Sequence, residues 1–238
     1  MPSKNHANSD NSLLGALPQP AQRRFVADCT PVVLGCGQVL AASGKRMRHV
    51  YFPTRGYISL TAPVDGIAWL GIGLVGDEGM LGVQLAFGID VSPLTATVLV
   101  ESAALRMETS AFRRQLAASP GLLRVLNCYC YVRVSQLAQA SSCNRFHPVE
   151  QRLARRLLMT QDRAHSDVFH VTQQALARVL GVRRPAVNVA ASTLQGRNLI
   201  RYRRGDITIL DRDGLDAVAC SCYAADNAIY NRMMNGSH

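Results

Sequence analysis

The sequence is poor in lysine, in aromatic residues and in long apolar runs. Only Lys4 and Lys45 are lysines among 26 basic residues, so arginine carries almost all of the formal net charge of +10. No apolar run approaches the ~20 residues that a membrane-spanning helix needs, which argues against a membrane protein. Residues 1–12 are polar and lack the apolar core of a signal peptide. We therefore expect a disordered tail there and a cytoplasmic location.

Cysteine is present, but not in a pattern typical of a metal centre. The chain has seven cysteines, an odd number, and disulfides are rare in a reducing cytosol. The close pairs Cys128/Cys130 and Cys220/Cys222 lack Cys-x-x-Cys spacing, and the histidines at 49, 147, 165 and 170 form no i, i+4 pair among themselves. The interpretation from sequence is structural cysteines, no metal site and no cofactor; a redox or metal role is the alternative.

Catalytic patterns are missing as well. The sequence shows no Ser/His/Asp set, no phosphate-binding glycine loop and no carboxylate pair at usable spacing. We therefore expect that the protein is not an enzyme. Its apolar content of 48% is nevertheless ample for folded cores.

Residues 170–210 carry the clearest signal. Thr172 suits a helix N-cap, apolar residues follow at helical spacing, and Gly181 suits a helix end. Pro185 fits the first turn of a second helix. Two short β-rich runs, 199–202 and 207–210, follow, joined by Arg-Arg-Gly-Asp, which is typical of a hairpin turn. Helix, glycine turn, helix and basic hairpin together predict a winged helix-turn-helix that binds duplex DNA.

The charge distribution favours the same interpretation. Residues 145–204 contain twelve arginines and three carboxylates, an excess of nine positive charges. A concentrated basic region is typical of a phosphate-binding surface. The alternative is a solvated basic surface that serves only solubility.

The N-terminal half has a different pattern. Residues 13–28 predict short helical structure, and β-rich runs with turn signals follow about every ten residues. This pattern predicts an antiparallel β-barrel or jelly roll over residues 13–118. The expected strands include residues 30–34, 49–52, 56–60, 69–72 and 96–100.

A single long helix is expected at residues 120–142, within a segment 119–143. Its apolar positions approximate an i, i+3/i+4, i+7 series: Leu122, Leu123, Leu126, Tyr129, Val134, Leu137 and Ala140. Additional valines widen the stripe, which favours a helix that packs on its symmetry mate. The alternative is a helix buried wholly in its own domain. The fold class is thus α+β: barrel, dimerisation helix and, over residues 144–238, a winged helix-turn-helix domain closed by a helix at 213–223.

This order of elements resembles the Crp–Fnr family of bacterial transcription regulators over residues 13–223. The most specific part is residues 172–209, where Leu-Gly-Val-Arg-Arg-Pro-Ala-Val and Gly-Arg-Asn-Leu-Ile look like the family's recognition helix and wing entry. Residues 104–112 are similar to the strand-then-helix exit of its sensory barrel. The resemblance implies a homodimer that places paired recognition helices in successive major grooves of a near-palindromic site, with RNA polymerase as a further partner.

The sensory half departs from the family's cyclic-nucleotide binders. Those hold the phosphate with a Gly-Glu segment followed by an Arg-Ser/Thr pair. Here residues 76–82 are a distorted form of the first segment, and residues 90–94 contain no arginine. Because a phosphate needs a cation or aligned N–H donors, cyclic AMP is not the expected effector, and the effector is unknown. The candidate pocket residues are Glu78, Gly79, Met80 and Gly82. With only Cys29 and Cys36 in this half, a four-cysteine iron–sulfur site is not expected either.

The recognition helix also differs, because the family's best-known readers pair an acidic residue with an arginine. Here Arg184 suits guanine and Asn188 suits adenine, or a phosphate. The expected DNA contacts are Thr172, Gln173, Arg183, Arg184, Asn188, Ser192, Arg203 and Arg204. The competing function is a ligand-binding signalling module that does not bind DNA.

Overall fold

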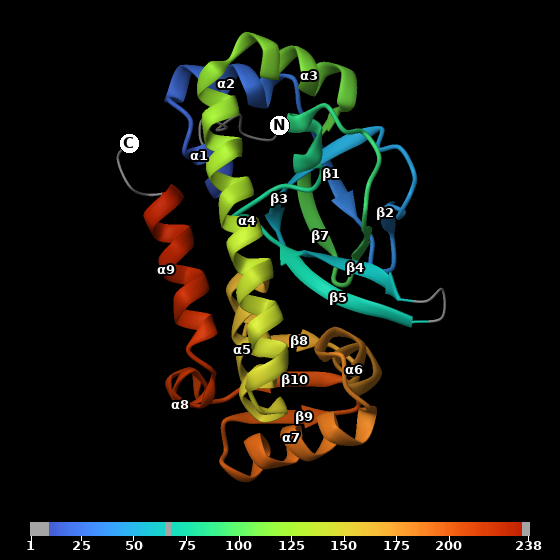
Figure 1. Ribbon diagram of the computed structural model, residues 1–238, viewed down its shortest axis with the longest axis vertical. Coiled ribbons are helices and arrows are strands. Elements are labelled where there is room, and N and C mark those ends of the chain that lie inside the picture. Colours follow the sequence, from blue (N-terminus) through green and yellow to red (C-terminus); the bar gives the residue numbers. More distant parts are fainter. Residues whose placement is uncertain (1–9, 65–67, 235–238) are drawn as a thin grey trace, which may run out of the picture.

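In the computed structural model, which describes residues 10–64 and 68–234, a β-rich domain and a helix-turn-helix domain lie at opposite ends of one long helix (Figure 1). The long helix, α4 (Pro120–Phe146), runs down the face toward the viewer. No helix of the described residues is long and apolar enough to cross a membrane.

Part of the tail expected at residues 1–12 is packed against the β domain. Residues 1–9 lie outside the described residues, but Asn11 is fully buried and caps α1 (Ser12–Gly15) by accepting from the Leu14 N–H. The Asn11 amide also donates to the carbonyls of Pro53 and Gly79, at 2.8 and 2.9 Å. The expected boundary at residue 12 is therefore wrong, because one buried asparagine ties this segment to the β domain. The next helix is α2 (Gln19–Ala27).

The β domain consists of two antiparallel sheets, in the orders β1-β7-β3 and β2-β6-β4-β5. Inward side chains of both sheets form one apolar core, so the predicted barrel or jelly roll is confirmed. A short 3₁₀ helix, η1 (Val83–Phe87), follows β5. The strands are β1 (Thr30–Leu34), β2 (Val39–Ala41), β3 (His49–Arg55), β4 (Ile58–Val64), β5 (Ala68–Val75), β6 (Thr95–Val98) and β7 (Ser102–Glu108).

A second core joins the sheets to the helices. Phe25 of α2 meets Phe52 of β3 edge to face, with ring centroids 5.2 Å apart. Helix α3 (Thr109–Ala118) follows β7, which confirms the strand-then-helix exit. Ser119 then caps α4 by accepting from the Leu122 N–H.

Helix α4 is one turn longer than expected. It continues past residue 142 to Phe146 and ends where His147 adopts an extended conformation, since the following Pro148 disfavours a helical residue before it. Helix α5 (Val149–Ala164) begins directly after that proline. The His147–Pro148 junction is thus the hinge between the two halves of the molecule.

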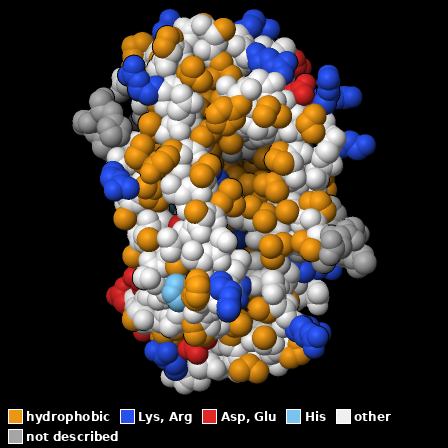
Figure 2. Space-filling model, viewed as in Figure 1, with side chains coloured by type: hydrophobic (Ala, Val, Ile, Leu, Met, Phe, Trp, Pro, Cys, Tyr) orange, Lys and Arg blue, Asp and Glu red, His pale blue; other side chains and the backbone are white. Residues whose placement is uncertain are grey.

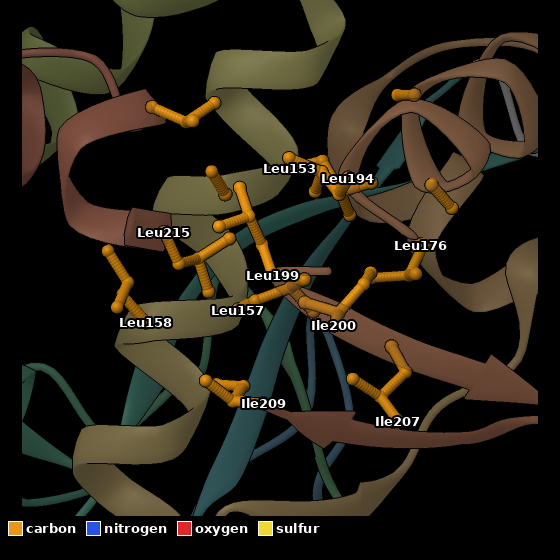
Figure 3. Packing of buried hydrophobic residues seen from close by; sticks show 14 of the residues in the cluster. Leu153, Leu157, Leu158, Leu176, Leu194, Leu199, Ile200, Ile207, Ile209 and Leu215 are labelled. Atoms are coloured by element: carbon orange, nitrogen blue, oxygen red, sulfur yellow. The ribbon is translucent and has the colours of Figure 1, made fainter. Parts of the chain in front are cut away.

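The C-terminal domain contains the predicted helix-turn-helix and wing. Helices α6 (Gln173–Leu180) and α7 (Arg184–Gly196) precede strands β9 (Ile200–Arg203) and β10 (Asp206–Ile209). The sequence did not predict β8 (Val168–His170), which pairs with β10 and gives a three-stranded wing sheet in the order β8-β10-β9. Leucines and isoleucines of α5, α6, α7 and the sheet close the core of this domain (Figure 3).

The end of the chain differs from the single helix expected at residues 213–223. Helix α8 (Arg212–Val218) stops at Ala219, and a separate helix, α9 (Cys222–Met234), runs back along α4 (Figure 1). Helix α9 escaped prediction because its buried residues, Cys222, Tyr223 and Asp226, all lie in its first turns. The last four residues, Asn-Gly-Ser-His, predict an unstructured end from sequence, and they lie outside the described residues.

Candidate nucleic-acid interface

Local capping fixes the ends of α6. The Thr172 hydroxyl accepts from the Ala175 N–H at 3.1 Å, and Gly181 takes a left-handed conformation, φ +62°, at the other end. The buried face of α6 contains Leu176, Ala177 and Leu180. These are the N-cap and the glycine turn that the sequence predicted, and they set the angle at which α7 follows.

Helix α7 has one buried face and one exposed face. Val187, Ala190, Ala191 and Leu194 hold it against the domain core. The opposite face is exposed and includes Arg184, Asn188, Val189 and Ser192. An exposed, largely polar helix face without its own packing partner is what insertion into a major groove requires.

A short hydrogen-bond chain orders the start of this exposed face. The Arg184 Nε donates to Gln173 Oε1 at 3.2 Å, and Gln173 Nε2 donates to Asn188 Oδ1 at 3.1 Å. Gln173 of α6 therefore bridges two residues of α7 that stand about one turn apart. This arrangement limits the rotamers of both side chains before any ligand arrives.

The wing turn holds an arginine in an unusual conformation. Arg204 and Gly205 have φ of +54° and +94°, as in the two-residue turns in which Asn-Gly is favoured. Glycine is suited to such a position, whereas arginine is strained there. Arg204 is exposed, so packing does not explain why an arginine occupies the position.

Helices α6 and α7 and the wing enclose a groove with a volume of about 540 Å³. Tyr202 anchors one side by donating its hydroxyl to the Val171 carbonyl at 2.7 Å, and burial raises the pKa of this tyrosine to about 12. The groove is lined by Thr172, Gln173, Gln174, Arg184, Tyr202, Arg204 and Gly205.

The structure thus brings four of the expected DNA-contacting residues, Thr172, Gln173, Arg184 and Arg204, into one groove. Four others, Arg183, Asn188, Ser192 and Arg203, are exposed on α7, before it or at the end of β9. Gln174 and Tyr202 also line the groove and were not among the residues predicted from sequence. The alternation of the wing strand around Tyr202 was the available signal for that residue.

Not all arginines of the basic segment, residues 145–204, lie at the surface. Of the twelve arginines at residues 145–204, four lie on α5 and face the interior: Arg152, Arg155, Arg156 and Arg163. The remaining arginines of the segment are exposed. The basic surface is therefore smaller than the sequence count suggested, because α5 uses its arginines for contacts within the protein.

The α5 arginines bind groups from distant parts of the chain. Arg155 donates to Asp226 of α9 at 2.5 Å, and Arg163 donates to Glu78 of the β domain at 2.8 Å. Arg152 donates to the Leu180 carbonyl at the end of α6. Burial lowers the pKa of Arg156 to about 10. Burial would also lower the pKa of Arg163, but the Glu78 carboxylate outweighs that effect and its pKa is raised.

The effector-pocket candidates are packed against the protein itself. Glu78 accepts from Arg163 and from the Gly76 N–H, and Tyr129 of α4 accepts from the Met80 N–H at 3.3 Å. A Cβ added at Gly79 would clash with the Tyr129 hydroxyl, so this glycine is required by the close approach. Met80 is buried.

Gly82, the remaining candidate, has φ of +104° and begins η1, with its Cβ position against Val50. The segment therefore serves as a junction between the β domain, α4 and α5. In the second segment, at residues 90–94, Arg46 and Arg113 each lie 3.7 Å from the Asp90 carboxylate. In the first segment, Arg163 of α5 binds Glu78.

Three of the cysteines expected to be structural lie together with one histidine. Cys143, His147, Cys220 and Cys222 converge at the junction of α4 with the α8–α9 break. Hydrogen bonding by the Cys220 thiol lowers the pKa of Cys143. The only local signal in the sequence is the spacing of Cys143 and His147, four residues apart, because Cys220 and Cys222 come from a distant part of the chain.

Comparison with known proteins decides the type of domain. Residues 151–218 match the family model of the Crp-like helix-turn-helix domain. The chain has a Crp-like helix-turn-helix domain. This match confirms the resemblance of the C-terminal domain to the Crp–Fnr family, and it includes α6, α7 and the wing. No curated protein matches the chain by sequence.

The similarity to solved structures covers more of the chain than this Crp-like domain. The c-di-GMP responsive global regulator CLP from Xanthomonas campestris is 18% identical, with a TM-score of 0.66 over 81% of this chain and 99% of its own. FixK2 from Bradyrhizobium japonicum is 13% identical, with a TM-score of 0.68 over 81% and 98%. A transcriptional regulator of the CRP family from Thermus thermophilus is 15% identical, with a TM-score of 0.66 over 79% and 96%.

These similarities show that the β domain, the long helix and the Crp-like domain together have the fold of these regulators. The family match to a Crp-like helix-turn-helix domain agrees with the helix-turn-helix that the sequence predicted.

Proposed function

We propose that the protein is a homodimeric transcription regulator that reads a near-palindromic duplex through α7 and grips the flanking phosphates with its wing. The observation that carries this proposal is the exposed face of α7, ordered by Gln173 and bordered by Arg204 in a strained turn. An arginine suits guanine O6/N7 and an asparagine suits adenine N6/N7 in the major groove.

The residue roles follow from position. Arg184, Asn188 and Ser192 face outward along α7 and would meet base edges or the nearest phosphates. Arg203 and Arg204, at the wing turn, would contact phosphates beside the groove. Thr172, Gln173 and Arg183, at the starts of the two helices, would orient the others and bind backbone phosphates.

An apolar strip on α4 supports the homodimer. Leu123, Tyr131, Val134 and Leu137 are exposed, and Val134 keeps 65% of its surface accessible. Figure 2 shows hydrophobic side chains gathered along this face of the molecule, where α4 runs in Figure 1. Exposed apolar strips of this kind mark protein interfaces. A second copy of α4 would cover the strip and set two α7 helices about 34 Å apart, as a two-fold reader requires.

Sedimentation equilibrium tests the dimer. Val134→Glu would place a carboxylate in the middle of the apolar seam, and we expect it to shift the protein toward monomer. Gln19→Glu, an exposed change on α2 that adds the same charge outside α4, is the control for charge alone. Unchanged dimerisation of Val134→Glu would remove α4 as the seam.

Base readout in the groove is tested with Arg184→Ala on an operator selected from random duplexes. We expect a loss of about 1–3 kcal/mol on the selected site and a much smaller loss on random duplex. Arg197→Ala removes the same charge at the far end of α7 and serves as control. Equal losses on both duplexes would make Arg184 a phosphate contact only. Absence of any duplex binding would favour the signalling module without DNA binding.

We also propose that cyclic AMP is not the effector. The support is that Arg163 and Tyr129 already bind the residues that would contact a cyclic phosphate. Calorimetric titration with cyclic AMP and cyclic GMP should therefore detect no micromolar binding. Binding that disappears in Glu78→Gln would show that the segment still works as a phosphate cassette.

The proposed role implies RNA polymerase as a partner and a cytoplasmic location. A regulator of this kind acts beside RNA polymerase in the cytoplasm. A signal could act through the Glu78–Arg163 contact, because a ligand shifts an equilibrium only by its different affinities for two arrangements.

A further inference from the structure

Four metal-ligating side chains meet at the hinge between the two halves of the protein. Cys143 and His147 lie at the end of α4, whereas Cys220 and Cys222 flank the break between α8 and α9. One ligand atom from each residue can be chosen so that all four lie within 4.8 Å of one another. The three cysteines are at most 5% exposed and form a small buried cluster.

Local structure explains why they meet. Residues four apart on a helix share a face, so Cys143 and His147 point the same way from the last turn of α4. Ala219 leaves the helical conformation, with ψ of 149°, and this turn directs Cys220 and Cys222 toward that face. The two pairs are separated by more than 70 residues of sequence and come together only in the folded chain.

The distances fit a single tetrahedral ion. Zn–S bonds of about 2.3 Å and Zn–N bonds of about 2.0 Å give edges of about 3.8 Å between sulfurs and about 3.5 Å between sulfur and nitrogen. The observed distances are 3.5 Å for Cys143 Sγ to Cys220 Sγ and 3.5 Å for Cys222 Sγ to His147 Nδ1. Small movements of the thiols would open the remaining space for an ion.

We propose that Cys143, His147, Cys220 and Cys222 bind a structural zinc ion. Three thiolates and one neutral imidazole are a common closed set for structural zinc, and they leave no open position for catalysis. Soft thiolate ligands disfavour magnesium and calcium, which prefer oxygen.

Groups around the cluster suit the charge of such a centre. Three thiolates around Zn²⁺ leave one net negative charge, and the Arg155 guanidinium acts electrostatically on Cys143. The Gln139 amide donates to Cys222 Sγ at 3.0 Å, a contact that orients the sulfur toward the cluster.

The position of the site would let a bound ion affect the orientation of the DNA-binding domain. The ion would connect the end of α4 to α8 and α9 at the His147–Pro148 hinge, where α5 and the DNA-binding domain begin. A bound zinc would hold the Crp-like domain at one angle to the dimerisation helix. Loss of zinc would free this hinge and weaken DNA binding without touching any DNA-contacting residue.

Metal analysis of the reduced full-length protein tests the proposal. We expect about one zinc ion per chain in the wild type and a loss of more than about tenfold in occupancy for Cys220→Ser and for His147→Ala. Cys130→Ser, a change on α4 outside the cluster, is the matched control and should keep its zinc.

A second measurement covers variants that fail to fold. The wild type is stripped with a chelator under reducing conditions and titrated with Co²⁺, which reports tetrahedral thiolate ligation by its visible absorption. We expect one equivalent of cobalt to saturate this signal, zinc to displace it, and Tm to fall by about 5 °C or more in the stripped protein.

Three outcomes would overturn the proposal. The first is wild type that neither contains zinc nor binds cobalt when reduced. The second is a Cys143–Cys220 disulfide in the freshly purified protein without metal, which would indicate a thiol switch. The third is iron with cluster absorption in anaerobically purified protein.

Discussion

The arginines of α5 and those of α7 and the wing are equally dense in the sequence but differ in what they contact. Arg155 and Arg163 lie inside, and each pairs with a carboxylate from a distant element. Arg184 and Arg204 are exposed beside an open groove. The comparison teaches that net charge locates a basic segment, whereas only the partner of each guanidinium separates structural arginines from DNA-binding ones.

The largest expected effect lies in the interior set. Arg163→Met removes one partner of a pair whose side chains are 10% and 19% exposed, and it leaves the Glu78 carboxylate without its cation. We expect the free energy of unfolding to fall by about 3 kcal/mol, measured by urea denaturation. The double variant Arg163→Met/Glu78→Gln should recover much of that loss, because the uncompensated charge is gone. Equal instability of the single and double variants would refute the pairing argument.

At Arg204 in the wing turn, we expect one substitution to change stability and DNA affinity in opposite directions. Arg204→Asn keeps a residue suited to φ of +54° and removes the guanidinium, so we expect stability to rise by about 0.5–1 kcal/mol. DNA affinity should fall at the same time. A variant that gains stability and keeps full affinity would show that Arg204 has no role in binding.

The smallest effect is expected at an exposed pair. Arg197, whose side chain is 52% exposed, lies 3.4 Å from Glu150 at the surface. Arg197→Ala should change the free energy of unfolding by at most about 0.5 kcal/mol, because solvent screens such pairs. Thermal denaturation measures this, and a loss comparable with that of Arg163→Met would erase the distinction between interior and surface arginines.

Local signals made the helix-turn-helix predictable. The Thr172 cap, the Gly181 turn and Pro185 act within a few residues, and the sequence alone locates them. The alternating β-rich runs likewise predicted the two-sheet barrel. The candidate DNA-contacting face followed, because one apolar stripe fixes which side of α7 is exposed.

Long-range features were not predictable. Glu78 meets Arg163 across 85 residues, and Asp226 meets Arg155 across 71. Nothing local distinguishes those arginines from the exposed ones. Cys143 and Cys220 are 77 residues apart for the same reason, so their cluster appears only when α9 packs on α4.

The central claim, that the arginines beside the groove bind phosphates and those paired with a carboxylate do not, is tested most directly by the salt dependence of duplex binding. The slope of log K against log salt is measured for wild type, for Arg203→Ala/Arg204→Asn and for the control Arg197→Ala, which removes one arginine that is paired with Glu150. We predict a slope shallower by about one unit for each phosphate that is no longer neutralised, hence by about two units in the double variant, and an unchanged slope in the control. Identical slopes for all three proteins would contradict the account.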